Sequence, residues 1–218
     1  MMKKPVSPMQ KTLNFWAIIL IVWSIYRANF HLPEAVDELI VKPAIFILPV
    51  YFFITRWEKR PFFAGIGLNF SSIKKDALVG FGAGGLFFLV GILANYFKHQ
   101  RQIVLPSFHL APALASLVLA TATSVSEEVL SRGFVLKRLY QESKNVFSAS
   151  FLASVLFFFL HVPILFTSLR ISGGTILFIM ATDIVFSLFV SFTYLERKSL
   201  LPAILIHALY NLSFVFFV

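Results

Sequence analysis

Long apolar stretches follow one another along this chain of 218 residues, and short segments between them carry most of the charge. An α-helix needs about 20 mostly apolar residues to cross a bilayer, and it satisfies its own backbone hydrogen bonds in lipid. The sequence therefore predicts an all-α, polytopic transmembrane helix bundle with about seven spans, six to eight being allowed. In chain order the predicted spans are Leu13–Phe30, Ile40–Thr55, Ala77–Phe97, Ala111–Tyr140, Ser148–His161, Thr175–Leu195 and Leu201–Val218.

The composition agrees with a membrane location. Hydrophobic residues make up 58% of the chain and charged residues 13%, which is far from the balance of a soluble globular domain. Phenylalanine alone contributes 27 residues, as expected where side chains face lipid. The chain contains no cysteine, which excludes a disulfide framework, a thiol nucleophile and a thiolate metal site.

The net charge of +9 is explained by membrane topology rather than by nucleic-acid binding, because the basic residues lie at the ends of apolar segments. Cytoplasmic loops are enriched in Lys and Arg. We therefore predict a multi-pass integral membrane protein with a cytoplasmic N-terminus and an outer C-terminus, in the plasma (inner) membrane if the source is bacterial. Only five of the 19 Lys and Arg residues then fall in outer segments: Arg27, Lys42, Lys98, Arg101 and Arg170. Three acids fall in the first outer loop: Glu34, Asp37 and Glu38.

Two further segments have a recognisable pattern. The segment Arg56–Asp76 mixes charged and aromatic residues, which is typical of an element lying along the membrane surface. Pro61, Gly65 and Gly67 argue against one continuous helix there. The third span has a small-residue face that suits close helix packing. Its glycines are Gly80, Gly82, Gly84, Gly85 and Gly91.

Two adjacent glutamates, Glu127 and Glu128, interrupt the fourth span after a stretch without charge. A carboxylate at membrane depth is costly, so such a pair indicates a functional site. Glu128 and Arg132 are i,i+4 neighbours and can pair, whereas Glu127 points about 100° away. The face of Glu127 holds three hydroxyls that can hydrogen-bond a carboxylate: Thr123, Ser124 and Ser131. We expect Glu127 to be the reactive group, and Glu128 with Arg132 to be its structural support.

Two later spans also carry histidines. His161 ends the fifth span, and His207 and Asn211 share one face of the seventh. At ~1.5 Å per residue, Glu127 and His161 both lie ~20 Å along their helices and His207 ~10 Å, so one shared cavity is geometrically allowed. A single membrane histidine more often packs or forms interhelical hydrogen bonds than catalyses. Asp183 is expected to be a hydrogen-bonded structural residue, and no chemistry is assigned to His31, His99 or His109.

These residues resemble the motifs of the CAAX protease and bacteriocin-processing (CPBP) family of intramembrane proteases, also called the abortive-infection family. Its first motif is a Glu-Glu pair with Arg four residues after the second Glu, here Glu127, Glu128 and Arg132. Its second motif is Phe followed four residues later by His, and its third is His followed four later by Asn or Asp. These correspond to Phe157 with His161 and to His207 with Asn211. The resemblance covers about residues 111–211 and suggests two regions, N-terminal helices over 1–110 and a catalytic core over 111–218.

The resemblance implies an intramembrane endopeptidase that hydrolyses a peptide bond in a protein or peptide substrate. Glu127 and His161 would activate water, and His207 and Asn211 would stabilise the oxyanion. Glu128 and Arg132 would hold the site in shape. A CAAX substrate would be a C-terminally prenylated protein.

Two alternatives stay open. If the reaction required zinc, Glu127, His161 and His207 would be its ligands, although the HExxH spacing is missing and we favour a metal-free reaction. Without catalysis, the same polar residues would serve bacteriocin immunity, partner recruitment or proton-coupled transport.

Overall fold

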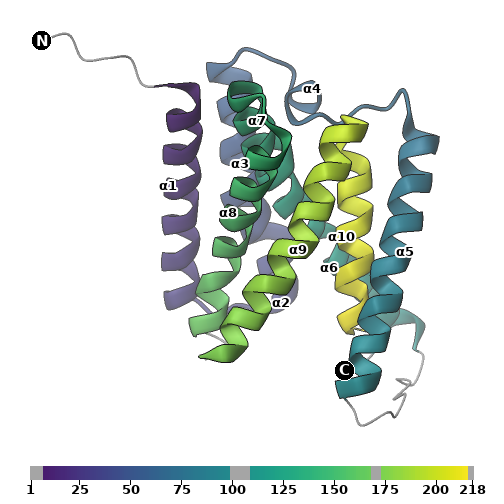
Figure 1. Cartoon of the computed structure of the whole chain (residues 1–218). Coiled ribbons are helices and arrows are strands. Elements are labelled where there is room, and N and C mark those ends of the chain that lie inside the picture. Colours follow the sequence, from purple (N-terminus) through teal and green to yellow (C-terminus); the bar gives the residue numbers. More distant parts are fainter. Residues whose placement is uncertain (1–6, 99–108, 168–172, 216–218) are drawn as a thin grey trace, which may run out of the picture.

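The computed structural model describes residues 7–98, 109–167 and 173–215, and within these ranges it is all-α (Figure 1). The end of the last predicted span, 216–218, lies outside the described residues, as do His99, Arg101 and Arg170. The helices are α1 (Pro8–Asn29), α2 (Glu34–Val36), α3 (Lys42–Phe52), α4 (Phe62–Ile66), α5 (Ile73–Lys98), α6 (Leu110–Glu128), α7 (Lys137–Ser143), α8 (Val146–Thr167), α9 (Gly174–Arg197) and α10 (Leu200–Val215). Three π-helical segments join some of them: η1 (Asp37–Val41), η2 (Phe53–Trp57) and η3 (Val129–Leu136).

Every predicted span is helical where it is described, which confirms the fold class. By length and composition, five helical stretches of the described chain can cross a membrane. They are Glu34–Trp57, Ile73–Leu93, Leu110–Ser143, Val146–Leu165 and Gly174–Arg197. The shorter apolar stretch Leu200–Phe214 accompanies them. These stretches make the chain a multi-pass membrane protein.

The second span begins earlier than predicted, at Glu34 rather than Ile40. Pro33 precedes the first helical turn, and Glu34 lies in that turn, where a negative charge interacts favourably with the helix dipole. The acids expected in a loop, including Glu38, are therefore helical. Lys42, whose charge was counted with the outer segments, is buried at the start of α3.

Local signals explain where several helices begin and end. Ser7 caps α1 by accepting a hydrogen bond from the backbone N–H of Gln10, and Pro8 follows at the first helical position. Asn145 accepts from the N–H of Ser148 at the start of α8. Gly67 ends α4 in the left-handed conformation with φ 76°, which glycine adopts without strain. α8 continues to Thr167, beyond its predicted end at His161.

The long helices form one bundle in which α1 lies at one edge and α5 at the other (Figure 1). α8 packs against α1 and α9, and α10 packs against α5, α6 and α9. α1 begins and α10 ends at opposite ends of the bundle (Figure 1). Large apolar side chains face outward along the helices, for example Leu78, Phe81 and Phe178. Such an apolar exterior is what a lipid environment requires.

The small-residue face of α5 packs against α10, as predicted for three of its five glycines. A Cβ atom on Gly80 would meet Leu205 at 2.8 Å, and one on Gly84 would meet Leu209 at 2.7 Å. A Cβ on Gly91 would lie still closer to Ser213, whereas Gly82 and Gly85 have nothing within 4 Å of an added Cβ. The close approach of the two helices therefore depends on the first three glycines.

The predicted surface segment Arg56–Asp76 contains the end of η2, the short helix α4 and the start of α5, so it is not one continuous helix. It packs on one end of the bundle through backbone carbonyls. Lys137 Nζ donates to the carbonyls of Ala64 and Gly65, and the Tyr194 hydroxyl donates to that of Ile66. These hydrogen bonds tie the segment to α7 and α9.

Candidate active site

The helix that carries the glutamate pair changes its winding directly after the pair. α6 ends at Glu128, and the π-helical segment η3 begins at Val129. Wider π-helical turns inside α-helices often occur at functional sites. The Arg138 guanidinium donates to the carbonyls of Gly133 and Phe134, at 3.4 and 3.0 Å, which helps to satisfy the backbone there. Most of the charged second half of the predicted fourth span is buried inside the bundle.

A cavity of about 340 Å³ lies between the helical stretch that begins at Glu34 and the helices α6, α8 and α10. Four of the residues predicted for catalysis line it together, although they come from three helices. They are Glu127, His161, His207 and Asn211. The remaining lining residues are Glu34, Glu38, Lys42, Ser116, Leu119, Ala120, Thr123 and Phe214.

The two oxygens of the Glu127 carboxylate have different surroundings. Oε1 lies 3.1 Å from the Lys42 ammonium nitrogen. Oε2 lies 3.6 Å from His161 Nε2 and 3.7 Å from His207 Nε2. Oε2 is buried and accepts no hydrogen bond from any described residue. One oxygen is therefore held by a cation, and the other faces two imidazole nitrogens.

Glu128 forms the ion pair that the sequence predicts. Its Oε1 lies 2.7 Å from Arg132 Nη1 and 2.8 Å from His207 Nδ1. Arg132 Nη2 donates to the hydroxyl and the carbonyl oxygen of Ser187, and the guanidinium lies over the Phe157 ring at 4.3 Å from its centroid. Glu128 and Arg132 thereby connect α6 and η3 to α9 and to a histidine of α10.

None of the three predicted hydroxyl partners of Glu127 binds it. Thr123 donates to Glu38, and Ser124 donates to the carbonyl of Ala120 and accepts from Asn211 Nδ2 at 3.3 Å. The Ser131 hydroxyl has no partner among the described side chains and backbone. Glu127 nevertheless has a charged partner, because Lys42 from a distant segment reaches it at 3.1 Å, whereas Glu128 has two shorter contacts, with Arg132 and His207.

Sequence reasoning missed Lys42 and Glu38 as parts of this site. Lys42 is 85 residues away from Glu127 in the chain, and its charge was counted with the outer segments. The available signal was the i,i+4 spacing of Glu38 and Lys42 at the start of an apolar stretch, which is the spacing of a helical ion pair. That spacing indicates a helix but gives no indication of what else the lysine contacts.

Asp183 of α9 contacts one of the predicted catalytic residues. Its Oδ2 lies 3.5 Å from His161 Nδ1, on the opposite side of the imidazole from Glu127. The His161 ring packs edge-to-face on Phe157, with 5.0 Å between the centroids. His161 is therefore placed between two carboxylates. The mid-span position of Asp183 was visible in the sequence, but its neighbour was not.

The residues do not fit the zinc alternative. No group of three or more His, Asp or Glu residues in the described ranges is arranged to hold a metal ion. The Lys42 ammonium already balances the charge of Glu127, and a divalent cation on that carboxylate would lie close to this positive charge. No chemical step is therefore derived through a metal.

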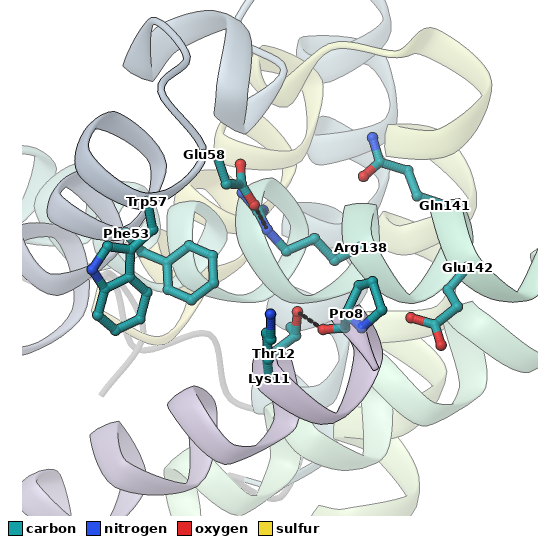
Figure 2. A pocket seen from close by; sticks show the side chains of 9 residues that line it. All are labelled: Pro8, Lys11, Thr12, Phe53, Trp57, Glu58, Arg138, Gln141 and Glu142. Atoms are coloured by element: carbon teal, nitrogen blue, oxygen red, sulfur yellow. Dashed lines mark hydrogen bonds and ion pairs between the residues drawn. The ribbon is translucent and has the colours of Figure 1, made fainter. Parts of the chain in front are cut away.

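A larger cavity of about 830 Å³ lies at the end of the bundle where α1 begins, between α1, η2 and α7 (Figure 2). None of the predicted site residues lines it. Arg138 binds Glu58 at 2.8 and 2.7 Å, and Glu142 accepts from the backbone N–H of Met9 (Figure 2 shows the Arg138 and Glu58 side chains in contact). Size alone does not make this cavity the chemical site.

The comparison with known families matches the part of the chain that carries Glu127 and the other predicted catalytic residues of the cavity. Residues 109–213 match the family described as Type II CAAX prenyl endopeptidase Rce1-like. This segment, slightly less than half of the chain, is therefore similar to that family. The matched range contains Glu127, His161, His207 and Asn211 and ends before the last residues of α10. No curated protein and no solved structure matches the chain.

The matched family is described as an endopeptidase family, so the similarity of residues 109–213 to it points to a peptidase and a peptide substrate. Lys42 and Glu38 lie outside the range matched by the family. The Rce1-like segment supplies the glutamate pair and the histidines, and the preceding helices supply the cation that contacts Glu127.

Proposed function

We propose that this chain is an intramembrane endopeptidase that hydrolyses a peptide bond with a water molecule activated by Glu127 and His161. The observation that carries the proposal is the convergence of a buried carboxylate and two histidines from three helices on one cavity. The similarity to the matched family supports the same reaction class.

The spacing around Glu127 Oε2 suits a bridging water. Its distances to the two imidazole nitrogens, 3.6 and 3.7 Å, exceed the usual range for direct hydrogen bonds. Polar groups at such separations are often joined through one water. In the proposed reaction Glu127 takes a proton from this water as the water attacks the substrate carbonyl carbon. The protonated carboxyl then delivers that proton to the leaving amine.

His161 orients the water and is itself oriented by Asp183. A carboxylate on one side of an imidazole favours the tautomer with a proton on the nearer nitrogen. The Asp183 carboxylate next to Nδ1 therefore favours an Nδ1–H. In the neutral ring, Nε2 then presents a lone pair towards the water and Glu127.

His207 and Asn211 are proposed to stabilise the oxyanion. Glu128 is paired with Arg132 and accepts hydrogen bonds, so His207 Nδ1 must carry the proton between them. His207 can then donate from Nε2 only in its doubly protonated form. We propose that this imidazolium, balanced by Glu127 and Glu128, donates to the oxyanion together with the Asn211 amide.

Replacement of Glu127 tests the reaction directly. Glu127→Gln keeps the shape of the side chain but removes the base, so cleavage should fall by roughly 10²- to 10⁴-fold, the usual contribution of general acid–base catalysis. The measurement is hydrolysis of an internally quenched, farnesylated peptide ending in a CAAX sequence by the purified protein in lipid nanodiscs. Glu142→Gln, in the cavity of Figure 2, is the matched control and should leave the rate unchanged.

Full activity of Glu127→Gln at an unchanged protein level would contradict this assignment. The same assay after exhaustive chelation tests the zinc alternative, because a metal-free reaction keeps its rate. Loss of activity that zinc alone restores would contradict the metal-free mechanism. If cells that carry Glu127→Ala process the same peptides as cells that carry the wild type, a non-catalytic role is favoured.

A further inference from the structure

Lys42 is a buried cation that contacts two glutamates at once. Its ammonium nitrogen lies 2.8 and 2.6 Å from the two carboxylate oxygens of Glu38 and 3.1 Å from Glu127 Oε1. The lysine lies at the first position of α3, in a segment outside the range that the family model matches. A lysine is rarely buried unless it is paired, and here the pairing reaches the proposed base.

Besides Glu127, the lysine contacts Glu38 and Trp23, and both of these are held by other helices. Glu38, one helical turn earlier, accepts a hydrogen bond of 2.6 Å from the Thr123 hydroxyl of α6. The ammonium lies 5.6 Å from the centroid of the Trp23 ring, within the range of a cation–π contact. The indole N–H of Trp23 donates to the carbonyl of Leu160, the residue before His161. The arrangement thus links α1, α3, α6 and α8 around the cavity.

We infer that Lys42 is a positioning residue for the proposed peptidase: its ammonium binds Glu127 Oε1 and thereby turns Oε2 towards His161 and His207. The inference rests on the proposed function and adds a residue from the N-terminal helices to its site. A carboxylate has two equivalent oxygens, and a cation on one of them fixes which oxygen meets the water.

Charge balance gives a second reason for the lysine. Glu38, Glu127 and Glu128 lie close together, and the Arg132 guanidinium is used by Glu128. Without Lys42, Glu38 and Glu127 would lose their shared cation, and repulsion would favour other orientations of the Glu127 side chain. A displacement of about 1 Å in a catalytic group can reduce a rate by about 10²-fold.

The natural absence of cysteine permits a test by chemical rescue, because Lys42→Cys introduces a single thiol. Aminoethylation with 2-bromoethylamine converts this thiol into a lysine analogue with the same number of side-chain atoms and a terminal ammonium. Propylation with 1-iodopropane gives a side chain of equal length without charge. Unmodified and propylated Lys42→Cys should show kcat ~10- to 100-fold below wild type with KM changed less than about 3-fold. The aminoethylated protein should regain most of kcat.

The control is Lys137→Met, which removes a partly buried lysine that binds only backbone carbonyls at the end of the bundle. Its kcat should stay at the wild-type value. Equal kcat in the propylated and aminoethylated proteins would overturn the inference, as would full activity of unmodified Lys42→Cys.

A stability measurement separates this inference from the proposed function. Lys42→Met should lower the midpoint of thermal unfolding in detergent, and adding Glu127→Gln should restore part of that loss, because the pair is coupled. Strict additivity of the two substitutions would overturn the inference whether or not a peptide is cleaved. If the wild-type protein cleaves no peptide but the two substitutions are coupled, the proposed function and the positioning role are both contradicted. The contact between Lys42 and Glu127 is then still supported.

Discussion

At the scale of single residues, buried charges of this protein form ion pairs, some within one helical stretch and others between distant helices. Lys42 binds Glu38 and Glu127, Arg132 binds Glu128, and other pairs occur outside the site. A charge without a partner is costly in a low-dielectric interior, so each pair constrains the helices that carry it. The site therefore depends on these pairs for its shape as well as for its charge.

Removal of Arg132 should show this dependence. Arg132→Met leaves the Glu128 carboxylate buried without its main counter-charge, and removing one partner of a buried pair typically costs about 3–5 kcal/mol of unfolding free energy. The measurement is unfolding in mixed micelles of increasing SDS content. Arg56→Met, at an exposed arginine, is the control and should change stability by less than about 0.5 kcal/mol.

The double variant Glu128→Gln/Arg132→Met removes both charges and should be more stable than Arg132→Met alone. If Arg132→Met unfolds at the same SDS content as wild type, the ion pair does not support the site as described.

At the scale of secondary-structure elements, close packing of α10 on α5 sets the position of His207 and Asn211. Gly80 and Gly84 let the backbones approach, and the α10 segment that they contact includes Ile206, the residue before His207. Small residues at such interfaces are typical of membrane helices, because van der Waals contact replaces the hydrophobic effect. The sequence indicated this face of α5 but not the helix that it meets.

Two neighbouring glycines allow a matched test of that packing. A Cβ on Gly84 would meet Leu209 Cδ1 at 2.7 Å and the Ile206 Cα at 3.1 Å, whereas one on Gly85 would meet nothing within 4 Å. Gly84→Ala should therefore lower the unfolding free energy by about 1–3 kcal/mol, the usual cost of overpacking. Gly85→Ala should be neutral or slightly stabilising, because alanine favours helix.

SDS unfolding of the two alanine variants provides the measurement, and cleavage of the farnesylated peptide shows whether the shift of α10 reaches the site. Equal stability of the two variants would contradict the proposed dependence on the α5–α10 contact.

At the scale of the whole molecule, the cavity draws on both halves of the chain. Both regions proposed from the sequence, residues 1–110 and 111–218, line this cavity. Glu34, Glu38 and Lys42 come from the first region, and Glu127 and the two histidines come from the second. The first region therefore contributes to the site in addition to anchoring the chain in the membrane.

The orientation in the membrane stays a prediction that follows from the distribution of Lys and Arg. We expect the N-terminus in the cytoplasm and the C-terminus outside, which agrees with the opposite ends of the bundle at which α1 begins and α10 ends (Figure 1). Bacterial alkaline phosphatase fused after Val218 should be active, since this reporter works only outside the cytoplasm, whereas green fluorescent protein at the same place should be dark. The reverse result would contradict the predicted topology.

The sequence by itself determined the helices and the residue types of the site, because both depend on local information. Runs of apolar residues predict spans, and i,i+4 spacing predicted the pair of Glu128 and Arg132. Only the tertiary structure decided what Glu127 contacts: Lys42, 85 residues away, binds it, and two of the adjacent hydroxyls bind other groups. The physical reason is that a buried carboxylate needs a counter-charge, and helix packing, which single-helix periodicity does not describe, determines which charge can reach it.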